Sequence, residues 1–439
     1  MQTIDRLIHA RWIIPVEPDG TVLDQHAVAI DKGRIVEVLG SAQAKEKYRA
    51  PITHTLTEHA LIPGLINAHT HAAMSLMRGI ADDLHLMDWL QNHIWPAEGK
   101  HVGAQFVREG TQLAMAEMLR SGTTCFNDMY FFPDEAARAA DEAGMRAAIS
   151  LIAIDFPSAW AGSADDYLHK GLAVHDQYRD HPLITTVFGP HAPYTVADAV
   201  LEKIRTYADE LDLQIQMHVH ETAHEVNEYQ QRNGERPLAR LQKLGLVTPR
   251  LMAVHMTQLS DAEIVMLSAS GAHVVHCPES NLKLASGYCR VHDLLQADVN
   301  VALGTDGAAS NNDLDMFSEM RTAALLAKTV AHDASALPAA RALRMATLNG
   351  AKALGIDAIT GSIMPGKAAD LTAVYLGSPE TQPVYHPISH LVYAAGREHV
   401  TDVWVAGKHL LKDRELTTID LPAVLGKARA WQEKMKPFD

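Results

Sequence analysis

The sequence predicts an α/β fold, a (β/α)8 TIM barrel, with a small composite β-sandwich domain built from both ends of the chain. Three observations favour this fold. Eight apolar, strand-like runs alternate with helical patterns between residues 59 and 360. No Gly-x-Gly-x-x-Gly motif follows an early strand, which disfavours a doubly wound open sheet. Short strands and tight turns dominate only residues 1–58 and 361–439, which we expect to form the second domain.

The N-terminal segment carries hairpin signals. Apolar runs at Leu7–Val16, Ala27–Ile30 and Ile35–Leu39 are separated by turns that contain Asp-Gly or Lys-Gly. The same character returns near the other end of the chain, at Asp370–Leu376 and Val403–Lys408. These later strands have no evident core of their own, so we expect them to pair with the N-terminal strands.

Strand-like and helix-like stretches alternate between these two ends, as in repeated βα units. The eight expected strands are Leu61–Ala68, Thr123–Asp128, Arg146–Ile154, Ile184–Gly189, Leu213–His218, Leu251–His255, His273–Cys277 and Asn300–Thr305. The expected helices include Ala104–Leu119, Asp198–Glu210, Ala223–Asn233, Asp261–Ser268, Leu314–Val330 and a closing helix over Leu421–Lys434. Active sites of such barrels lie at the C-terminal ends of the strands, so those residues are the candidates for chemistry.

Composition and charge exclude several classes of protein. The 439 residues hold 38 Lys and Arg against 53 Asp and Glu, and the resulting net charge of −15 argues against a nucleic-acid partner. The three cysteines have no paired spacing, which disfavours disulfides and a cysteine-based zinc site and fits a reducing compartment. The first residues lack signal-peptide features, and no apolar run reaches membrane-spanning length. We therefore expect a soluble cytoplasmic protein without a membrane partner.

Histidine and aspartate gather at the expected strand ends. His69 and His71 end the first barrel strand, and the period of two places them on the same side. Later strand ends carry His191, His218, His255, His276 and Asp306. We expect His69, His71, His218 and Asp306 to bind one divalent metal ion, leaving a position open for water. Such an ion lowers the pKa of bound water from 15.7 to roughly 7.

Three further residues are candidates for proton transfer. Glu221 follows His218 by three residues, so its carboxylate could carry a proton between water and a leaving group; the alternative is a favourable charge at a helix N-terminus. His220 would share the side of His218 if the strand continued, whereas a strand ending at 218 would let Glu221 reach the site. His255 could polarise the attacking water or be a satisfied core residue. Asp306 could accept the proton of the water.

Two other positions have both a functional and a structural interpretation. We expect Pro96 to break a helix and leave Glu98 free to face a pocket. There its carboxylate would accept two hydrogen bonds from a vicinal diol such as a ribose, although a solvated surface position is the alternative. His276 precedes Cys277-Pro278, and we expect it to be structural.

Taken together, these residues resemble the amidohydrolase superfamily and, within it, the 5′-methylthioadenosine/S-adenosylhomocysteine deaminase family. The stretches that carry the resemblance are Pro63–His71, Ile94–Glu98, Gly189–Tyr194, His218–Thr222, Ser280–Leu284, Gly304–Asn312 and Pro365–Leu371. The His-Thr-His and Thr-Asp-Gly sequences mark the superfamily. The Trp-Pro-Ala-Glu and Gly-Pro-His-Ala-Pro-Tyr sequences are more specific to this family and its neighbours. The similarity covers essentially the whole chain.

The resemblance implies a hydrolase acting on cyclic amidine C–N bonds, which converts an adenosine-type nucleoside to the inosine analogue plus ammonia. It assigns one divalent ion, zinc or another such as Fe²⁺, to His69, His71, His218 and Asp306. Glu98 would hold the ribose hydroxyls, His191 would contact the nucleoside, and Glu221 would protonate the ring nitrogen beside C6, to which hydroxide adds. Barrels of this kind often pair, so we expect a homo-oligomer, either a dimer or a tetramer.

The sequence departs from the family pattern at one place. Family members that accept the homocysteine tail tend to carry arginine after the third strand, whereas residues 150–165 contain none and offer Phe156 and Trp160. We therefore favour 5′-methylthioadenosine, with adenosine next, over S-adenosylhomocysteine. The alternatives are another mononuclear amidohydrolase, such as guanine deaminase or a triazine hydrolase, and a non-catalytic barrel. Glu221 favours ammonia over chloride as leaving group, and Glu98 favours a ribosylated substrate.

Overall fold

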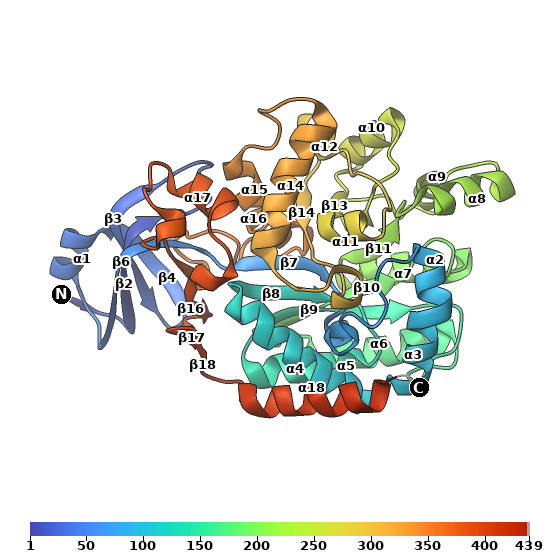
Figure 1. Cartoon of the computed structure of the whole chain (residues 1–439), viewed down its shortest axis with the longest axis horizontal. Coiled ribbons are helices and arrows are strands. Elements are labelled where there is room, and N and C mark those ends of the chain that lie inside the picture. The colour runs from blue at the N-terminus through green and yellow to red at the C-terminus, as the bar shows by residue number, and fades with distance from the viewer. Residues whose placement is uncertain (437–439) are drawn as a thin grey trace.

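The computed structural model describes residues 1–436 and confirms the predicted barrel (Figure 1). Eight parallel strands lie in sequence order in one sheet. They are β7 (Leu65–Thr70), β8 (Thr123–Asp128), β9 (Arg146–Ala153), β10 (Ile184–Pro190), β11 (Ile215–Val219), β12 (Leu251–His255), β13 (His273–His276) and β14 (Val301–Leu303). The strands are short and buried on both faces, as parallel strands covered by crossover helices must be.

Helices follow the strands and surround the barrel. They are α4 (Ala104–Arg120), α5 (Pro133–Ala143), α6 (Ala164–Tyr178), α7 (Asp198–Leu211), α8 (Ala223–Asn233), α9 (Pro237–Lys243), α10 (Asp261–Ser270), α11 (Pro278–Lys283), α12 (Val291–Gln296), α13 (Ala308–Asn311), α14 (Met316–Ala331), α15 (Ala339–Met345) and α16 (Leu348–Ala353). A segment between β7 and α4 contains η1 (Ala72–Met77), α2 (Leu86–Asp88), the π-helical η2 (Trp89–Ile94) and α3 (Trp95–His101). This segment covers the C-terminal ends of the strands.

The first and last barrel strands meet at a seam that side chains and a close backbone approach hold together. The backbone N–H of Asp306 donates to the carbonyl of His69 at 3.0 Å. Asn67 of β7 donates to the Thr305 hydroxyl at 2.7 Å and accepts from the Thr305 N–H at 3.0 Å. A Cβ on Gly304 would lie 2.8 Å from the Cβ of His69, so only glycine fits there. The seam therefore brings Asp306 beside His69 and His71.

Strands from both chain ends form a second, mixed eight-stranded sheet, as the sequence predicts (left in Figure 1). Its order is β18 (Glu415–Leu416), β17 (Lys408–Lys412), β16 (Val400–Val405), β15 (Leu371–Tyr375), β6 (Ile52–Pro63), β2 (Arg6–Ile13), β3 (Leu23–Asp31) and β4 (Arg34–Gly40). A bridge between Arg34 and Ala368 brings the edge strand β4 back to the segment before β15. The sheet thus curls around its own apolar core, which includes Ile8 and Trp404. The division of the chain at 58/59 and 360/361 stays a prediction.

The expected first barrel strand is in fact two strands in two different sheets. β6 ends at Pro63 in the outer sheet, and β7 begins two residues later in the barrel. Gly64 between them donates its N–H to the carbonyl of Asp370, and a Cβ there would clash with the side chain of Thr124. The continuous apolar run hid this switch, because both strands are buried. The strand that carries His69 and leads into His71 therefore follows directly from a strand of the outer sheet.

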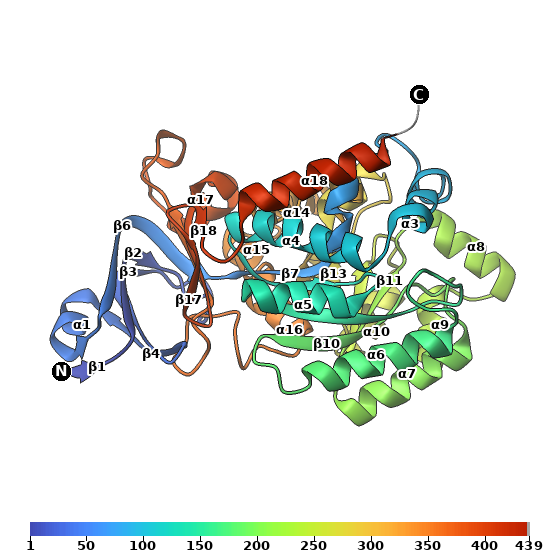
Figure 2. The same cartoon turned by 90° about the horizontal axis from the view of Figure 1, so that it is seen from below.

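The closing helix α18 (Leu421–Met435) is present as predicted and lies along α4 (Figure 2). Its Trp431 ring meets Phe106 edge-on at 5.1 Å and donates from Nε1 to Glu109 at 2.7 Å. The remaining elements are β1 (Gln2–Thr3), α1 (Ser41–Lys47), β5 (Tyr48–Arg49), η3 (Pro379–Thr381), α17 (Pro387–Tyr393) and η4 (Arg397–His399). The C-terminal helix therefore fastens the end of the chain to the barrel.

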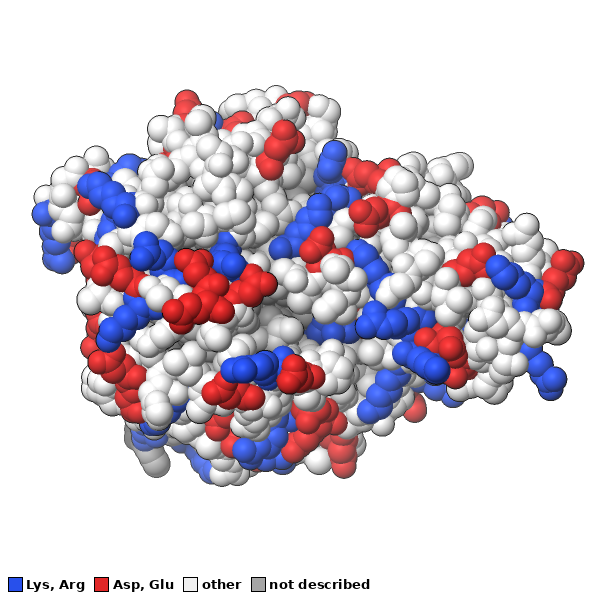
Figure 3. Space-filling model, turned by 180° about the vertical axis from the view of Figure 1, so that it is seen from behind, with Lys and Arg blue, Asp and Glu red and all other residues white. Residues whose placement is uncertain are grey.

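The surface carries charges of both signs. On the face shown in Figure 3, Lys and Arg side chains are interspersed with Asp and Glu. Among the helices of residues 1–436, none combines the length and apolar character that crossing a membrane requires.

Candidate functional site

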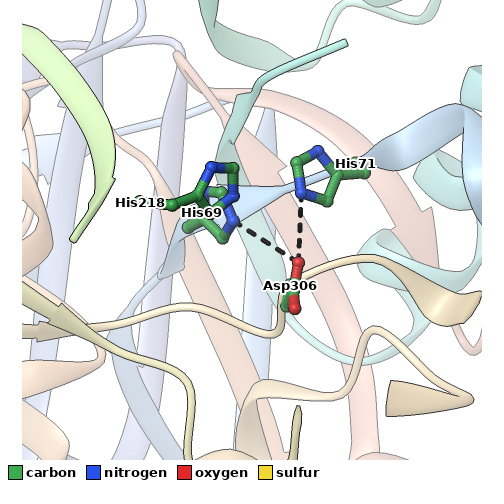
Figure 4. A group of neighbouring side chains, drawn as sticks. All are labelled: His69, His71, His218 and Asp306. Atoms are coloured by element: carbon green, nitrogen blue, oxygen red, sulfur yellow. Dashed lines mark ion pairs between the residues drawn. The ribbon is translucent and has the colours of Figure 1, made fainter. Parts of the chain in front are cut away.

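Four side chains converge at the C-terminal ends of the barrel strands (Figure 4). His69 comes from β7, and His71 directly follows that strand. His218 comes from β11, and Asp306 from the turn after β14. One ligand atom of each lies within 4.8 Å of those of the other three. Nε2 of His69 and Nε2 of His71 lie 3.4 and 3.2 Å from the same carboxylate oxygen, Oδ1 of Asp306. The structure thus brings together the four residues that the sequence suggested as metal ligands.

Backbone carbonyls orient two of the imidazoles. Nδ1 of His71 bonds to the carbonyl of Met129, and Nδ1 of His218 bonds to the carbonyl of His191 at 2.7 Å. A carbonyl only accepts, so each Nδ1 carries a hydrogen and each Nε2 faces the centre of the group. Metal-binding histidines commonly have such partners.

Asp306 is held equally firmly. The hydroxyls of Ser280 and Ser310 donate to its Oδ2 at 2.6 and 2.8 Å, and the N–H of Gly307 donates to Oδ1 at 2.8 Å. Burial alone would raise the pKa of this carboxyl, but the neighbouring His69 and His71 imidazoles hold it well below its usual range. Asp306 therefore stays ionised, as a ligand or a proton acceptor must be.

The donor set fits a divalent cation. His69 is fully buried, and neither of its ring nitrogens makes a hydrogen bond within residues 1–436. Burial lowers the pKa of His69 to about 4, which leaves a neutral imidazole. An unsatisfied buried imidazole is unfavourable, and a cation at Nε2 would relieve it. Burial opposes charge on His71, but Asp306 outweighs it and raises the pKa of His71 to about 9, so a cation would displace that proton. A three-histidine, one-aspartate metal site is therefore present.

A left-handed residue decides which side chain of the β11 end faces the pocket. β11 ends at Val219, and His220 has a φ of +54°. Its ring turns away from the pocket: Nε2 accepts from the N–H of Leu238 at 3.2 Å, and Nδ1 lies 3.8 Å from Glu263. Glu221 instead lines the pocket, and burial raises the pKa of its carboxyl. The ambiguity over His220 is resolved by this break in the strand alternation.

His255 faces Glu221 across the pocket. Its Nε2 lies 4.0 Å from Oε1 of Glu221, and its ring stacks on that of His218 at 5.5 Å between centroids. Nδ1 bonds to Oδ1 of Asn281 at 2.9 Å. An amide oxygen only accepts, so the ring carries a hydrogen on Nδ1 and turns Nε2 toward the pocket.

The pocket extends from the metal group to an apolar and aromatic region. Its walls include Met74, Leu86, Trp89, Leu90, Ile94, Trp95, Phe131, Ile152, Ile154, Phe156, Tyr194 and Leu284. Glu98 lies in its wall, where it accepts from the Tyr130 hydroxyl at 2.7 Å. Pro96 does not break a helix; it lies in the first turn of α3, directly after the π-helical segment, and the helix continues through Glu98. Proline is tolerated there because a first-turn N–H needs no helical partner.

The other candidates divide between the pocket and the core. His191 lines the pocket, bonds to Thr195 through Nδ1 at 3.0 Å, and has its pKa lowered to about 3 by burial, so it is neutral. His276 is buried outside the pocket walls, and its Nδ1 has no hydrogen bond within residues 1–436. Trp160 also lies outside the pocket, against Tyr167 at 5.6 Å.

Sequence reasoning missed the residues that support this site. Tyr130 lies two residues after Asp128, the last residue of β8, and no chemical role was predicted for that strand end. Ser280 and Asn281 lie in a stretch that carries the family resemblance, but no spacing rule linked them to Asp306 or His255. Ser310 lies four residues after Asp306, on α13. The signal that could have found them is their position after a barrel strand.

Comparison with known proteins agrees with this geometry. The chain matches the amidohydrolase family over residues 60–410. A protein from Saccharophagus degradans named 5-methylthioadenosine/S-adenosylhomocysteine deaminase is 52% identical over 432 residues, which cover 98% of this chain and 97% of that protein. A protein from Methanothermobacter thermautotrophicus named 5′-deoxyadenosine deaminase is 44% identical over 404 residues, covering 92% of this chain and 93% of its own length.

A solved structure is similar over the whole chain. The crystal structure of an adenosine deaminase from Xanthomonas campestris with bound zinc superimposes with a TM-score of 0.98, is 55% identical, and covers 99% of both chains. The family resemblance seen in the sequence is thereby confirmed. The similar structure contains zinc, which agrees with the metal site of this chain. The chain belongs to the amidohydrolase family.

Proposed function

We propose that this protein is a metal-dependent hydrolytic deaminase that converts an adenosine-type nucleoside, preferably 5′-methylthioadenosine, to the inosine analogue plus ammonia. The observation that carries the proposal is the content of one pocket. Three of the metal ligands (His71, His218 and Asp306) line one part of it together with Glu221, and Glu98 lines the wall of the same cavity. The purine of a nucleoside needs the metal and the proton donor, and its ribose needs an acceptor for two hydroxyls. The names of the full-length relatives support this class of substrate.

Each residue of the pocket has a separate role in the proposed reaction. A divalent cation held by His69, His71, His218 and Asp306 would supply a water of lowered pKa. Asp306 is ionised and beside that position, so it accepts a proton there. Glu221 has a raised pKa and is positioned to give a proton to the ring nitrogen beside the attacked carbon. The neutral His191 contacts the nucleoside at the pocket wall.

His255 completes the reacting end of the pocket. Its acceptor at Nε2 suits a hydrogen bond from the attacking water, and its protonated form would steady the oxygen that the reaction adds. The metal and these proton carriers act on different atoms of the substrate, which is why the site needs both.

The 5′ end of the substrate meets apolar side chains. Trp95 lies one helical turn before Glu98, and its ring is 6.4 Å from that of Phe156. Among the described residues, no Lys or Arg lines this pocket. A methylthio group suits such a surface, whereas the carboxylate of a homocysteine tail would lack a cationic partner. This supports 5′-methylthioadenosine, with adenosine next, over S-adenosylhomocysteine.

Other mononuclear amidohydrolase activities remain as alternatives. A guanine deaminase would have no use for Glu98 as a diol ligand, since free guanine lacks a ribose. A triazine hydrolase would release chloride, which needs no proton from Glu221. Both residues line the pocket here, so we favour the nucleoside.

Product release from a panel of substrates tests the proposal, measured as ammonia for the nucleosides and guanine and as chloride for the triazine. The panel is adenosine, 5′-methylthioadenosine, S-adenosylhomocysteine, guanine and a chlorotriazine, each with the zinc-loaded protein. We expect 5′-methylthioadenosine to give the highest kcat/KM and guanine and the triazine to give none. Turnover of guanine or the triazine with no turnover of nucleosides would contradict the proposal.

Two further expectations concern the oligomeric state of the protein and its location in the cell. Self-association as a dimer or tetramer stays a prediction, which light scattering of the purified protein measures. A cytoplasmic location also stays a prediction, and fractionation of the source cells measures it.

A further inference from the structure

Tyr130 holds the carboxylate that faces the substrate ribose. It directly follows β8 and Met129, is 4% exposed, and lies in the pocket wall. Its hydroxyl donates to Oε1 of Glu98 at 2.7 Å. Within residues 1–436, this hydroxyl is the single side-chain hydrogen-bond donor to the Glu98 carboxylate. The neighbouring Met129 orients His71 through its carbonyl, so the end of β8 fixes both parts of the pocket.

The hydrogen bond affects the charge of Glu98 as well as its position. Burial raises the pKa of the Glu98 carboxyl, and the bond from Tyr130 opposes that rise. Burial and the nearby Glu98 raise the pKa of Tyr130 well above its ordinary value, so its hydroxyl remains a donor. A carboxylate that has lost this donor would have no partner before substrate arrives, and it would more readily take up a proton. A protonated carboxyl accepts fewer hydrogen bonds.

We propose that Tyr130 is a positioning residue for recognition of the vicinal diol. By occupying one lone pair of Glu98 Oε1, it fixes the rotation of the carboxylate so that the remaining lone pairs of both oxygens face the two ribose hydroxyls. Tyr130 thereby determines how strongly the enzyme prefers a ribonucleoside to a nucleoside without the diol. This inference rests on the proposed function, because it takes Glu98 as the ribose ligand.

A purely structural role for Tyr130 predicts something different. Its ring lies 5.4 Å from that of Phe131 and 6.3 Å from that of His71, so it also fills space. If it only filled space, losing the hydroxyl would weaken all substrates alike or none. If it positions Glu98, the loss depends on whether the substrate has hydroxyls to bind. Comparing substrates therefore separates the two roles.

The test compares the wild type and Tyr130→Phe on adenosine and on 2′,3′-dideoxyadenosine. We expect kcat/KM for adenosine to fall roughly 10- to 100-fold, chiefly through KM, as for loss of a hydrogen bond to a charged group. For the dideoxy substrate the fall should be under about threefold, because the substrate offers nothing to Glu98. Equal losses for the two substrates would overturn the inference.

A second variant tests the route of the effect. In a Glu98→Gln background, Tyr130→Phe should lower adenosine turnover by much less than in the wild type, because the two residues act as one unit. An undiminished effect there would also overturn the inference. Zinc content and the thermal midpoint of each variant show that it is folded and loaded.

The matched control is Tyr178→Phe, which removes the hydroxyl of another buried tyrosine, at the end of α6 and outside the pocket walls. It should leave the ratio of the two substrates unchanged. The wild type itself separates the possible failures. If it deaminates no nucleoside, the proposed function and this inference both fall. If it uses adenosine and dideoxyadenosine equally, the ribose role of Glu98 and this inference fall while the deaminase proposal stands.

Discussion

Glu221 and His255 face each other across the pocket, with Oε1 of the first 4.0 Å from Nε2 of the second. This separation is too long for a direct hydrogen bond, so neither side chain satisfies the other. The two come from the ends of adjacent strands, β11 and β12. A substrate atom between them would contact a carboxyl that donates a proton on one side and an imidazole that accepts one on the other.

Replacing the carboxyl of Glu221 tests its part in proton transfer. We expect Glu221→Gln to keep its full metal content and to lower kcat by about 10²- to 10⁴-fold, the usual contribution of a positioned acid. KM should change less, because the amide retains the size of the side chain. Steady-state ammonia release and metal analysis of the same sample give the answer. Near-normal turnover would remove Glu221 from the mechanism.

Asn281 should matter through the histidine that it orients. Asn281→Leu removes the acceptor for Nδ1 of His255, so the ring loses its fixed tautomer. We expect kcat to fall roughly 10- to 100-fold at unchanged metal content. Asn227→Leu, an exposed position on α8, is the control and should behave like the wild type. If the two variants are equally active, the hydrogen bond has no functional role.

Removing the metal should abolish activity and lower stability together. A chelator should eliminate ammonia release, and added zinc should restore it. Because the ion binds the folded chain, its removal should also lower the thermal midpoint; at a free concentration about 1,000 times Kd the ion contributes about 4 kcal/mol. Asp306→Asn should need more zinc for the same effect. Full activity in protein proved free of metal would refute the proposed chemistry.

The buried ion pair between the barrel and the outer sheet should be important for stability. Arg146 of β9 is 5% exposed and donates to both oxygens of the fully buried Asp370, at 2.8 and 3.3 Å. Arg146→Ala leaves a buried carboxylate unpaired, which costs about 3–5 kcal/mol. Arg179→Ala removes an exposed ion pair and should hardly move the denaturation midpoint. Equal midpoints in urea for the two variants would contradict this account.

Asp315 should make the protein less stable as the pH rises. Burial, with a smaller effect of Asp313 and Glu279 against Arg397, raises the pKa of its carboxyl to about 7. The folded chain therefore holds this proton between about pH 4 and pH 7, where the unfolded chain has released it, and stability falls across that window. Asp315→Asn keeps the N-cap hydrogen bond to Phe317 and removes the ionisation.

The variant should accordingly gain stability relative to the wild type as the pH rises. The gain should be near zero at about pH 4, grow until about pH 7, and reach on the order of 2–4 kcal/mol above that. Urea denaturation at several pH values measures it. The exposed Asp176→Asn is the control. A gain that is constant across pH would show that ionisation of Asp315 is not its cause.

Much of this site could be predicted because barrel topology converts sequence position into spatial position. Once alternating strands and helices indicate a parallel barrel, residues at strand ends must meet at one rim, and His69, His218 and Asp306 do so. The alternation of β7, continued by one residue past its end, likewise places His69 and His71 on one side. These inferences need only the period of the strands and their direction.

The features that could not be predicted do not follow from the periodic pattern of apolar residues along the strands and helices. The left-handed turn at His220 interrupts the alternation, and nothing in the local pattern of apolar residues marks it. The contact of Tyr130 with Glu98 joins two loops whose relative placement is set by packing around the π-helical segment. The passage from β6 to β7 was hidden because both sheets bury the same run of apolar side chains. Long-range contacts of this kind follow from the assembled fold.

The position of β6 in the outer sheet also bears on how the polypeptide is made. β6 pairs with β2 on one side, but its neighbour on the other side, β15, begins only at Leu371. During translation, the edge of β6 that pairs with β15 therefore stays unpaired until nearly the whole barrel has left the ribosome. An exposed, apolar strand edge invites pairing with other chains. We expect nascent chains that stop before residue 371 to require chaperones. The outer sheet is complete only when the C-terminal strands have paired with β6.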